Sequence, residues 1–147
     1  MAADRRGNSE GLASSLASVI LDTNFLFVPL RFGVDIFEEL ERVLGRHIRC
    51  IVPRPVIREL NLLKRDSNPS FQKEIDFALE LVRRCHVTDG DRVLAGGVDD
   101  HIMRLAIQTG YPVATNDKEF RRRLRAEGVP VIFLRQRTHL ELVGRMK

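Results

Sequence analysis

Acidic residues at four separated places in the chain could together bind a divalent cation. Each lies after an apolar, β-forming run or in the first turns of a predicted helix: Asp22, Glu59, Asp99, Asp100 and Asp117. Clustered carboxylates repel one another and raise each other's pKa values unless a cation neutralises them. Their oxygen ligands are hard, which suits Mg²⁺ or Mn²⁺ and not zinc. The acids therefore predict a magnesium or manganese site.

Such a site has the chemistry needed to hydrolyse a phosphodiester bond. A cation held by carboxylates binds the scissile phosphate, lowers the pKa of a water toward neutrality and stabilises charge on the leaving oxygen. Two cations roughly 4 Å apart would divide these tasks, and ligand type alone does not distinguish one metal from two. The chain shows no serine, cysteine or histidine arrangement typical of nucleophilic catalysis.

Each acid also has a purely structural explanation. The pair Asp99 and Asp100 could stabilise a helix N-terminus, and Asp117 could cap the helix that follows it. Glu59 could form an ion pair on a solvated helix face. Asp22 is hardest to explain this way, because an acid directly after three apolar β-forming residues is seldom only solvated. The joint pattern carries the inference.

The elements that must position these acids alternate between strands and helices. The expected strands cover residues 19–21, 50–52, 86–88, 112–115 and 131–134, and the expected helices cover 35–44, 55–64, 70–85, 98–109 and 118–126. This alternation predicts an α/β fold, a three-layer α/β/α domain with a mostly parallel central sheet. In an open parallel sheet, strand ends and the starts of the following helices share one edge, so the acids should converge there.

The ends of the chain are expected to contribute less. Residues 1–15 are polar and small, which predicts a flexible tail, and residues 16–147 are expected to form a single domain. Residues 25–30 are expected to form a short helical turn limited by Pro29. Residues 135–147 are expected to add an amphipathic turn through Leu140 and Val143.

Composition and charge narrow the class of protein. Of 147 residues, 44% are hydrophobic and 30% charged, and no apolar run approaches the roughly 18 residues that a membrane helix needs. A net charge of +4 is compatible with a phosphate-rich partner. Cys50 and Cys85 lack metal-site spacing, so we expect two small buried thiols, no membrane association and a cytoplasmic location.

Four motifs, in this order, resemble the PIN-domain ribonuclease family. They are Asp22-Thr23-Asn24 after a strand, Pro55-x-x-x-Glu59-Leu60, Asp99-Asp100-x-Ile102 with Ala106, and Val113-Ala114-Thr115-Asn116-Asp117. The resemblance covers about residues 19–134. The stretches 32–37 and 114–118 further resemble the archaeal and eukaryotic branch that processes pre-ribosomal RNA, and toxin-like members are the second choice.

The resemblance implies a metal-dependent endoribonuclease that uses Mg²⁺ or Mn²⁺. Its acidic residues match Asp22, Glu59 and Asp117, and its polar supporting residues match Asn24 and Thr115, with Asn116 beside them. The acid on the helix over 98–109 is ambiguous, since Asp99 fits one alignment and Asp100 another. Neighbouring helical residues point about 100° apart, so one of the two should face the metal directly.

The resemblance also implies RNA as the partner. Four arginines follow the proposed ligand Asp117 within one helix and could contact phosphates without reading sequence: Arg121, Arg122, Arg123 and Arg125. A solvated helix face would explain the same arginines. Further expected partners are a second copy of the chain, a ribosome-assembly factor or an antitoxin.

Three other functions compete with this prediction. An aspartyl phosphatase needs a second acid two residues after the first, and that position is Asn24. A receiver-like phosphorylation switch needs its acid pair near the first strand, whereas the pair here is Asp99 and Asp100. A non-catalytic RNA-binding or complex-assembly protein would keep the pocket for structure. The acids favour an enzyme.

Overall fold

The protein is described by a computed structural model that covers residues 16–88 and 96–146. The expected tail over 1–15 lies outside the described residues, and so does most of the stretch 89–97, which its glycines predict to be a loop. The described strands are β1 (Leu16–Leu21), β2 (His47–Pro53), β3 (His86–Thr88), β4 (Val113–Ala114), β5 (Val131–Arg135) and β6 (His139–Val143).

Helices follow most of these strands, as the alternation predicted. They are η1, a 3₁₀ helix (Thr23–Phe27), α2 (Val28–Phe32), α3 (Ile36–Leu44), α4 (Arg54–Arg65), α5 (Pro69–Val82), α6 (Gly97–Thr109) and α7 (Lys118–Ala126). None of the described helices is long and apolar enough to span a membrane.

Local chemistry explains where the helices begin and end. Asp35 caps α3 by accepting hydrogen bonds from two backbone N–H groups, and Gly45 ends that helix in the left-handed region at φ 65°. Pro55 lies in the first turn of α4, where its missing N–H costs no helical hydrogen bond. Asn68 caps α5 in the same way as Asp35, through the backbone N–H of Phe71.

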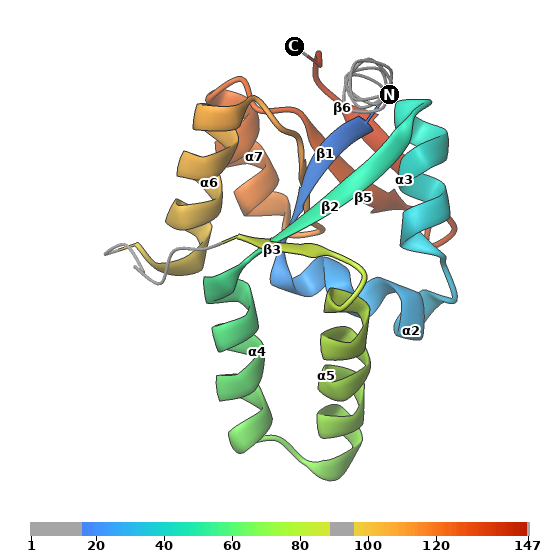
Figure 1. The fold of residues 1–147 in the computed structure, drawn as a ribbon, viewed down its shortest axis with the longest axis vertical. Helices are drawn as coiled ribbons and strands as arrows, with labels where there is room; N and C mark the ends of the chain where they lie inside the picture. Colours follow the sequence, from blue (N-terminus) through green and yellow to red (C-terminus); the bar gives the residue numbers. More distant parts are fainter. Residues whose placement is uncertain (1–15, 89–95, 147) are drawn as a thin grey trace, which may run out of the picture.

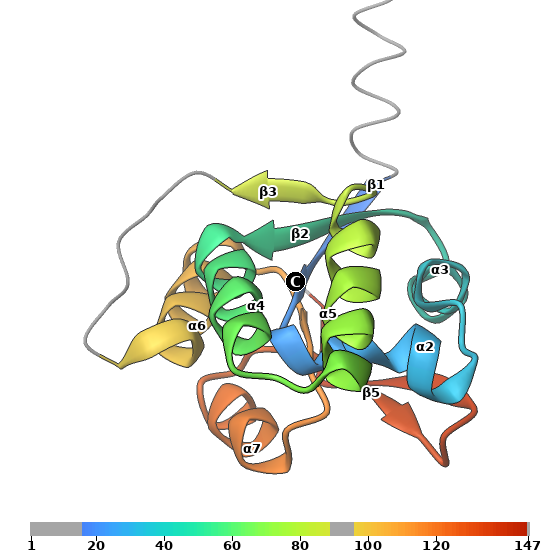
Figure 2. The same cartoon turned by 90° about the horizontal axis from the view of Figure 1, so that it is seen from below.

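The strands form one sheet in the order β3-β2-β1-β4-β5-β6. All neighbours pair in parallel except β5 and β6, which pair antiparallel. Helices α6 and α7 lie on one side of the sheet and α2 and α3 on the other (Figure 2). These observations confirm the three-layer α/β/α prediction. Figure 1 shows α4 and α5 as an antiparallel pair that extends from the end of the sheet where β2 finishes.

The core lies on both sides of the central strand. Val19, Ile20 and Leu21 of β1 are fully buried, as expected for a central parallel strand that is covered on both faces. Buried side chains from the helices and the other strands continue the same cluster.

Three local expectations were wrong. The predicted amphipathic turn near the C-terminus is instead strand β6, whose Leu140 is buried against the core. Residues 25–30 are helical as expected, but Pro29 does not limit them: it lies in the first turn of α2, which begins at Val28 and tolerates a missing N–H there. The helix expected to reach Cys85 ends at Val82, which leaves Cys85 only half-buried beside the buried Cys50.

Candidate active site

The sheet order creates a crevice at the carboxyl end of the central strands. From β1 the chain proceeds to β2 and β3 on one side, and it later returns to β4 and β5 on the other. Open α/β sheets bind ligands where the winding direction reverses in this way. Asp22 follows β1, and Thr115 follows β4, which pairs directly with β1. The first acid of the predicted site therefore lies at this switch point.

One cavity of about 390 Å³ opens beside this switch point. It is lined by Asp22, Thr23, Asn24, Phe27, Arg31, Glu59, Leu63, Phe71, Asp99 and Asp117. The structure thus brings together the four acids predicted from four separate segments. Glu59 reaches the cavity from α4 and Asp99 from the first turn of α6.

Asp100 faces a different environment from Asp99. It does not line the cavity, and its carboxylate lies 2.9 Å from a guanidinium nitrogen of Arg123 on α7. The same carboxylate occupies the space that a Cβ atom would need at Gly96, so any larger residue at that position must displace it. Because neighbouring helical residues point about 100° apart, Asp99 faces the cavity while Asp100 faces α7.

A threonine hydroxyl fixes the Asp22 carboxylate. Thr115 is fully buried, and its Oγ1 donates a 2.7 Å hydrogen bond to Asp22 Oδ2. The other oxygen, Oδ1, accepts from the backbone N–H of Thr23 at 2.8 Å. Asn24 donates from Nδ2 to Asp22 Oδ2 at 2.9 Å and to Thr115 Oγ1 at 3.2 Å. Asp22 therefore has one defined orientation, set by residues from both sides of the switch point.

The segment after β4 is fixed by the same network. Asn24 Oδ1 accepts from the backbone N–H of Asn116 at 2.9 Å, and Asn116 Oδ1 accepts from that of Leu134 on β5 at 2.9 Å. Asp117 caps α7 by accepting from the backbone N–H of Phe120 at 3.1 Å. Its structural role as a cap is thus real, yet the same side chain lines the cavity.

Burial and neighbouring carboxylates raise the pKa values of two of the acids, Asp22 and Asp99. Burial raises the pKa of Asp22 from 3.8 to about 6, with further increases from the charges of Asp99 and Glu59, against the lowering effect of its hydrogen bonds. The pKa of Asp99 is also raised, first by burial and then by the charge of Asp117. These mutual effects show that the four acids share one electrostatic environment, which a cation would stabilise.

A buried hydroxyl without a partner adjoins Asp22. The side chain of Thr23 lines the cavity, is only 7% exposed, and its Oγ1 has no hydrogen-bond partner in the structure. A buried polar atom without a protein partner usually forms a hydrogen bond to water or to a ligand. The sequence assigned no role to Thr23, because nothing in its position beside Asp22 revealed that its hydroxyl would be buried and unpaired.

These observations fit a hard divalent cation by donor chemistry. The four carboxylates that line the cavity and the unpaired hydroxyl of Thr23 are oxygen donors suited to Mg²⁺ or Mn²⁺. Within 16–88 and 96–146, however, no three acidic, histidine or cysteine side chains stand close enough to form a ready-made coordination sphere. The carboxylates would therefore have to move together, or use bridging waters, to share a cation.

The cavity has a wall that sequence reasoning missed. Arg31, Phe27, Leu63 and Phe71 line it together with the acids. Arg31 belongs to α2, just beyond the helical turn expected over 25–30, and Phe71 lies on α5. No motif signalled this wall, since it depends on how α2 and the α4–α5 pair pack at the end of the sheet.

The four arginines of α7 lie in different surroundings. Arg121 stacks at 4.0 Å over the ring of Phe133, Arg123 pairs with Asp100, and Arg125 donates to the backbone oxygen of Val129 at 3.1 Å. Arg122 is exposed, and the described part of the chain offers its side chain no hydrogen bond or ion pair. None of the four lines the cavity.

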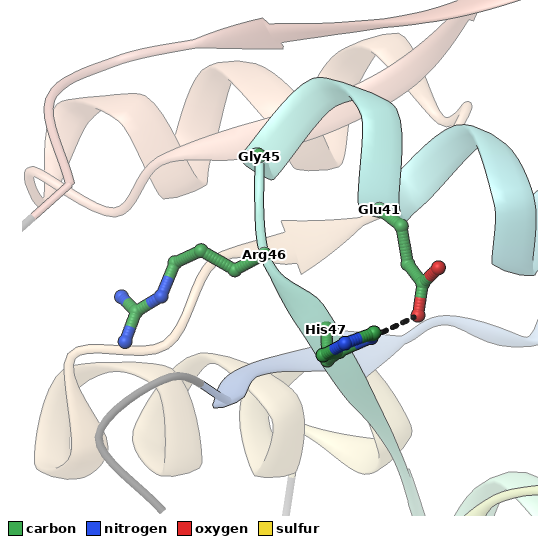
Figure 3. A pocket seen from close by; sticks show the side chains of 4 residues that line it. All are labelled: Glu41, Gly45, Arg46 and His47. Carbon is green, nitrogen blue, oxygen red and sulfur yellow. Dashed lines mark hydrogen bonds and ion pairs between the residues drawn. The ribbon is translucent and has the colours of Figure 1, made fainter. Parts of the chain in front are cut away.

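A larger hollow of about 520 Å³ lies away from the acids, between the end of α3 and the start of β2 (Figure 3). It is lined by Glu41, Gly45, Arg46 and His47, and His47 lies 3.4 Å from Glu41. Strands begin at this edge, opposite the edge where ligands bind in open α/β sheets. We assign it no function.

Comparisons with known sequences identify the family. A family model described as a PIN like domain matches residues 19–137. The chain is 30% identical over 129 residues to Ribonuclease VapC4 from Methanocaldococcus jannaschii, which covers 86% of this chain and 96% of that protein. It is 28% identical over 145 residues to Ribonuclease VapC9 from Archaeoglobus fulgidus, covering 97% and 99%.

Solved structures show the same similarity. The fold matches the structure of the PIN domain endonuclease Utp24 with a TM-score of 0.73 and 25% identity, over 88% of this chain and 93% of that one. It also matches a domain of a functionally unknown protein from Methanocaldococcus jannaschii with a TM-score of 0.59 and 22% identity, over 81% and 91%.

Proposed function

The chain belongs to the PIN-like domain family, and from that premise we propose that it is a metal-dependent endoribonuclease that hydrolyses RNA phosphodiester bonds. One observation supports this proposal most strongly. Carboxylates from four separate segments line one cavity at the switch point of the sheet, and burial and the neighbouring charges raise the pKa values of Asp22 and Asp99 among them. Such mutual destabilisation is typical of functional sites and not of solvated surfaces.

The residues divide into cation ligands and supports. We propose that Asp22, Asp99 and Asp117 hold Mg²⁺ or Mn²⁺ and that Glu59 adds negative charge at the cavity wall. On α6 we favour Asp99 as the direct ligand over Asp100, because Asp99 lines the cavity while Asp100 pairs with Arg123. When bound, such a cation neutralises the carboxylates and the scissile phosphate and acidifies an attacking water.

The supporting residues keep the ligands in place. Thr115 and Asn24 hold Asp22 through hydrogen bonds of 2.7 and 2.9 Å, so the carboxylate keeps its orientation without the cation. Asn116 joins this group to β5 through Leu134. Partners of this kind, hydrogen-bonded to metal ligands, typically contribute 10- to 100-fold to metal affinity or activity.

Cleavage of a labelled single-stranded RNA tests the proposal. The protein should cut it with Mn²⁺ or Mg²⁺ and stop when EDTA is added. Asp22→Asn and Asp99→Asn should each lower the rate by about 100-fold or more, since each removes a proposed ligand. Asp100→Asn, one position along the same helix, should lower the cleavage rate much less.

Two results would contradict the proposal. Equal cleavage by wild type and Asp22→Asn would exclude the acid site as its source. Tight RNA binding without cleavage in either metal would favour the alternative, a non-catalytic RNA-binding or complex-assembly protein.

For the substrate, we propose precursors of ribosomal RNA. The stretches 32–37 and 114–118 support this context through their resemblance to the branch that processes such RNA. The alternative is the ribonuclease of a toxin–antitoxin pair, which is supported by the names of the two relatives, Ribonuclease VapC4 and VapC9. The proposed partners differ accordingly: a ribosome-assembly factor in one case and an antitoxin in the other, with a homodimer compatible with both.

Expression in a host cell separates the two contexts. A toxin should arrest growth in its wild-type form but not as Asp22→Asn, and its gene should adjoin that of a small antitoxin. A processing enzyme should leave growth unaffected and produce new RNA ends within precursor ribosomal RNA, mapped by end sequencing. We propose the cytoplasm as the compartment, consistent with two cysteines that form no disulfide.

A further inference from the structure

The cavity that holds the acids has a second wall of different chemistry. We name it the aromatic wall and define it as Phe27, Arg31, Leu63 and Phe71, all of which line the cavity. Its residues come from η1, α2, α4 and α5, so four elements contribute to it. Its side chains are apolar or cationic, whereas those of the acidic part are anionic. The cavity therefore presents two chemically distinct halves to one ligand.

The rings of the aromatic wall form an ordered stack. Phe27 and Phe71 stack with centroids 5.6 Å apart and an angle of 26° between the rings. Phe27 is buried, so it supports the stack from below, while Phe71 is half-buried and Leu63 is 41% exposed. Exposed apolar area beside a polar site is typical of ligand binding. The wall thus presents apolar surface that the fold itself leaves uncovered.

Arg31 is fixed against these rings. Its Nε lies 2.7 Å from Glu74 Oε1, and its guanidinium carbon lies 4.8 Å from the centroid of Phe27 and 6.0 Å from that of Phe71. Among the described residues that line the cavity, it is the only basic one. A guanidinium plane held beside an aromatic ring is a surface on which a nucleobase can stack. The ion pair with Glu74 orders this plane in advance.

We propose that the aromatic wall is a nucleobase-binding subsite. A base of a single-stranded RNA stacks on Phe71 and the guanidinium plane of Arg31, which places a neighbouring phosphate at the carboxylates. This inference rests on the proposed function and deepens it by assigning how the substrate strand is held. The cavity volume of about 390 Å³ falls in the range of small-ligand sites, roughly 300–1,000 Å³, and suits one unpaired nucleotide. Stacking requires an unpaired base, so the subsite selects single strands over duplexes.

Cleavage kinetics with a matched pair of variants test the subsite. Phe71→Leu removes the ring but keeps apolar volume, and Phe77→Leu makes the same change on the exposed face of the same helix. Stacking of one base contributes about 1–3 kcal/mol, which corresponds to roughly 5- to 150-fold in affinity. We expect Phe71→Leu to raise KM by about tenfold with little change in kcat, and Phe77→Leu to change neither. Thermal unfolding confirms that both variants fold.

A substrate series identifies the base. RNAs with one abasic nucleotide at successive positions around the cleavage site should show a single position where KM rises for the wild type. At that position the abasic nucleotide should raise the KM of Phe71→Leu almost no further, because the two changes remove the same interaction. Arg31→Lys, which keeps the charge but removes the plane, should behave like Phe71→Leu.

The outcomes separate this inference from the proposed function. The subsite is overturned, and the nuclease left intact, if the wild type cleaves RNA and Phe71→Leu leaves KM unchanged. The same holds if the effects of Phe71→Leu and of the abasic nucleotide on KM are additive. Absence of cleavage counts against the nuclease, and 2-aminopurine at the identified or central position then reports on the wall directly. Quenching of its fluorescence on binding, lost in Phe71→Leu and kept in Phe77→Leu, supports the subsite. No quenching in the wild type overturns it.

Discussion

At the scale of single residues, Asp22 is held against opposing forces. Burial and the charges of Asp99 and Glu59 favour its protonated form, while hydrogen bonds from Thr115 and the Thr23 backbone favour the anion. Burial prevails, and the pKa rises to about 6. The fold thus tolerates a destabilising charge at its centre, as proteins commonly do at functional sites.

Stability should therefore depend on pH through Asp22. The pKa of Asp22 is raised in the folded state, so folding favours the protonated carboxyl. The contribution of Asp22 to the free energy of unfolding is therefore complete below pH 3.8, its ordinary pKa, and is lost as the pH rises through about 6. A shift of this size corresponds to about 3 kcal/mol. We expect Asp22→Asn to gain stability relative to wild type by up to about that amount between pH 4 and pH 7.

Urea unfolding in EDTA across this pH range measures the effect. Asp66→Asn, which changes an exposed carboxyl at the end of α4, should show no such trend. A constant difference between Asp22→Asn and wild type from pH 4 to pH 7 would contradict the raised pKa.

Residue type and position predicted the acids but not their surroundings. Asp22, Glu59, Asp99 and Asp117 could be identified because each follows a strand or lies in the first turns of a helix, and the topology rule then brings such positions together. The unpaired hydroxyl of Thr23 and the position of Arg31 could not, because both depend on packing between distant segments. The choice between Asp99 and Asp100 likewise needed the partner of Asp100, Arg123, on another helix.

At the scale of secondary structure elements, the hairpin of β5 and β6 was the main surprise. Gln136 and Arg137 in its turn have φ values of 53° and 64°, in the left-handed region that hairpin turns with φ above zero at both central positions require. Glycine or asparagine usually marks such turns, and neither occurs there. Without that signal, the alternation of Leu140 and Leu142 was too short to identify a strand.

Helix α3 fastens β6 to the rest of the fold. Glu39 Oε1 accepts from the backbone N–H of Leu140 at 3.0 Å, and Arg42, itself paired with Glu39 at 2.9 Å, donates to the Leu140 carbonyl oxygen at 3.0 Å. These contacts replace part of the strand pairing that the outer edge of β6 lacks. The edge of the sheet is thereby partly covered, which protects it from pairing with other chains.

Glu39→Ala should loosen this edge. It removes the acceptor of the Leu140 N–H and the partner of Arg42, so we expect a loss of about 1 kcal/mol in the free energy of unfolding. Amide hydrogen exchange should accelerate in β6 more than in β1. Glu38→Ala, an exposed acid on the same helix, serves as the control and should change neither quantity.

At the scale of the whole molecule, negative and positive charges lie in different places. The chain carries a net charge of +4, yet its central cavity is acidic, so basic residues elsewhere must supply the attraction for a nucleic acid. On α7 three of the four arginines are engaged within the fold, and Arg122 is left exposed. We therefore expect Arg122 to contribute more to long-range RNA binding than its three neighbours.

Salt dependence measures this contribution. For wild type, the logarithm of the RNA-binding constant should fall linearly with the logarithm of salt concentration, and Arg122→Gln should reduce the slope by about 0.7 for one lost phosphate contact. The loss should be similar for all RNA sequences. Arg83→Gln, in which an exposed arginine paired with Glu80 is removed, provides the comparison. Equal slopes for wild type and Arg122→Gln would place the RNA elsewhere.

The hydrogen bond between Thr115 and Asp22 also sets when the site can form during translation. Its two residues lie 93 positions apart, and Thr115 is itself held by β5 through the Ile132 backbone. At about 5–20 residues per second, a nascent chain that has exposed Asp22 waits roughly 5–20 s for its partner. Throughout that interval the chain is attached to a ribosome, a machine made largely of RNA. The acid site therefore assembles only after β5 has been synthesised.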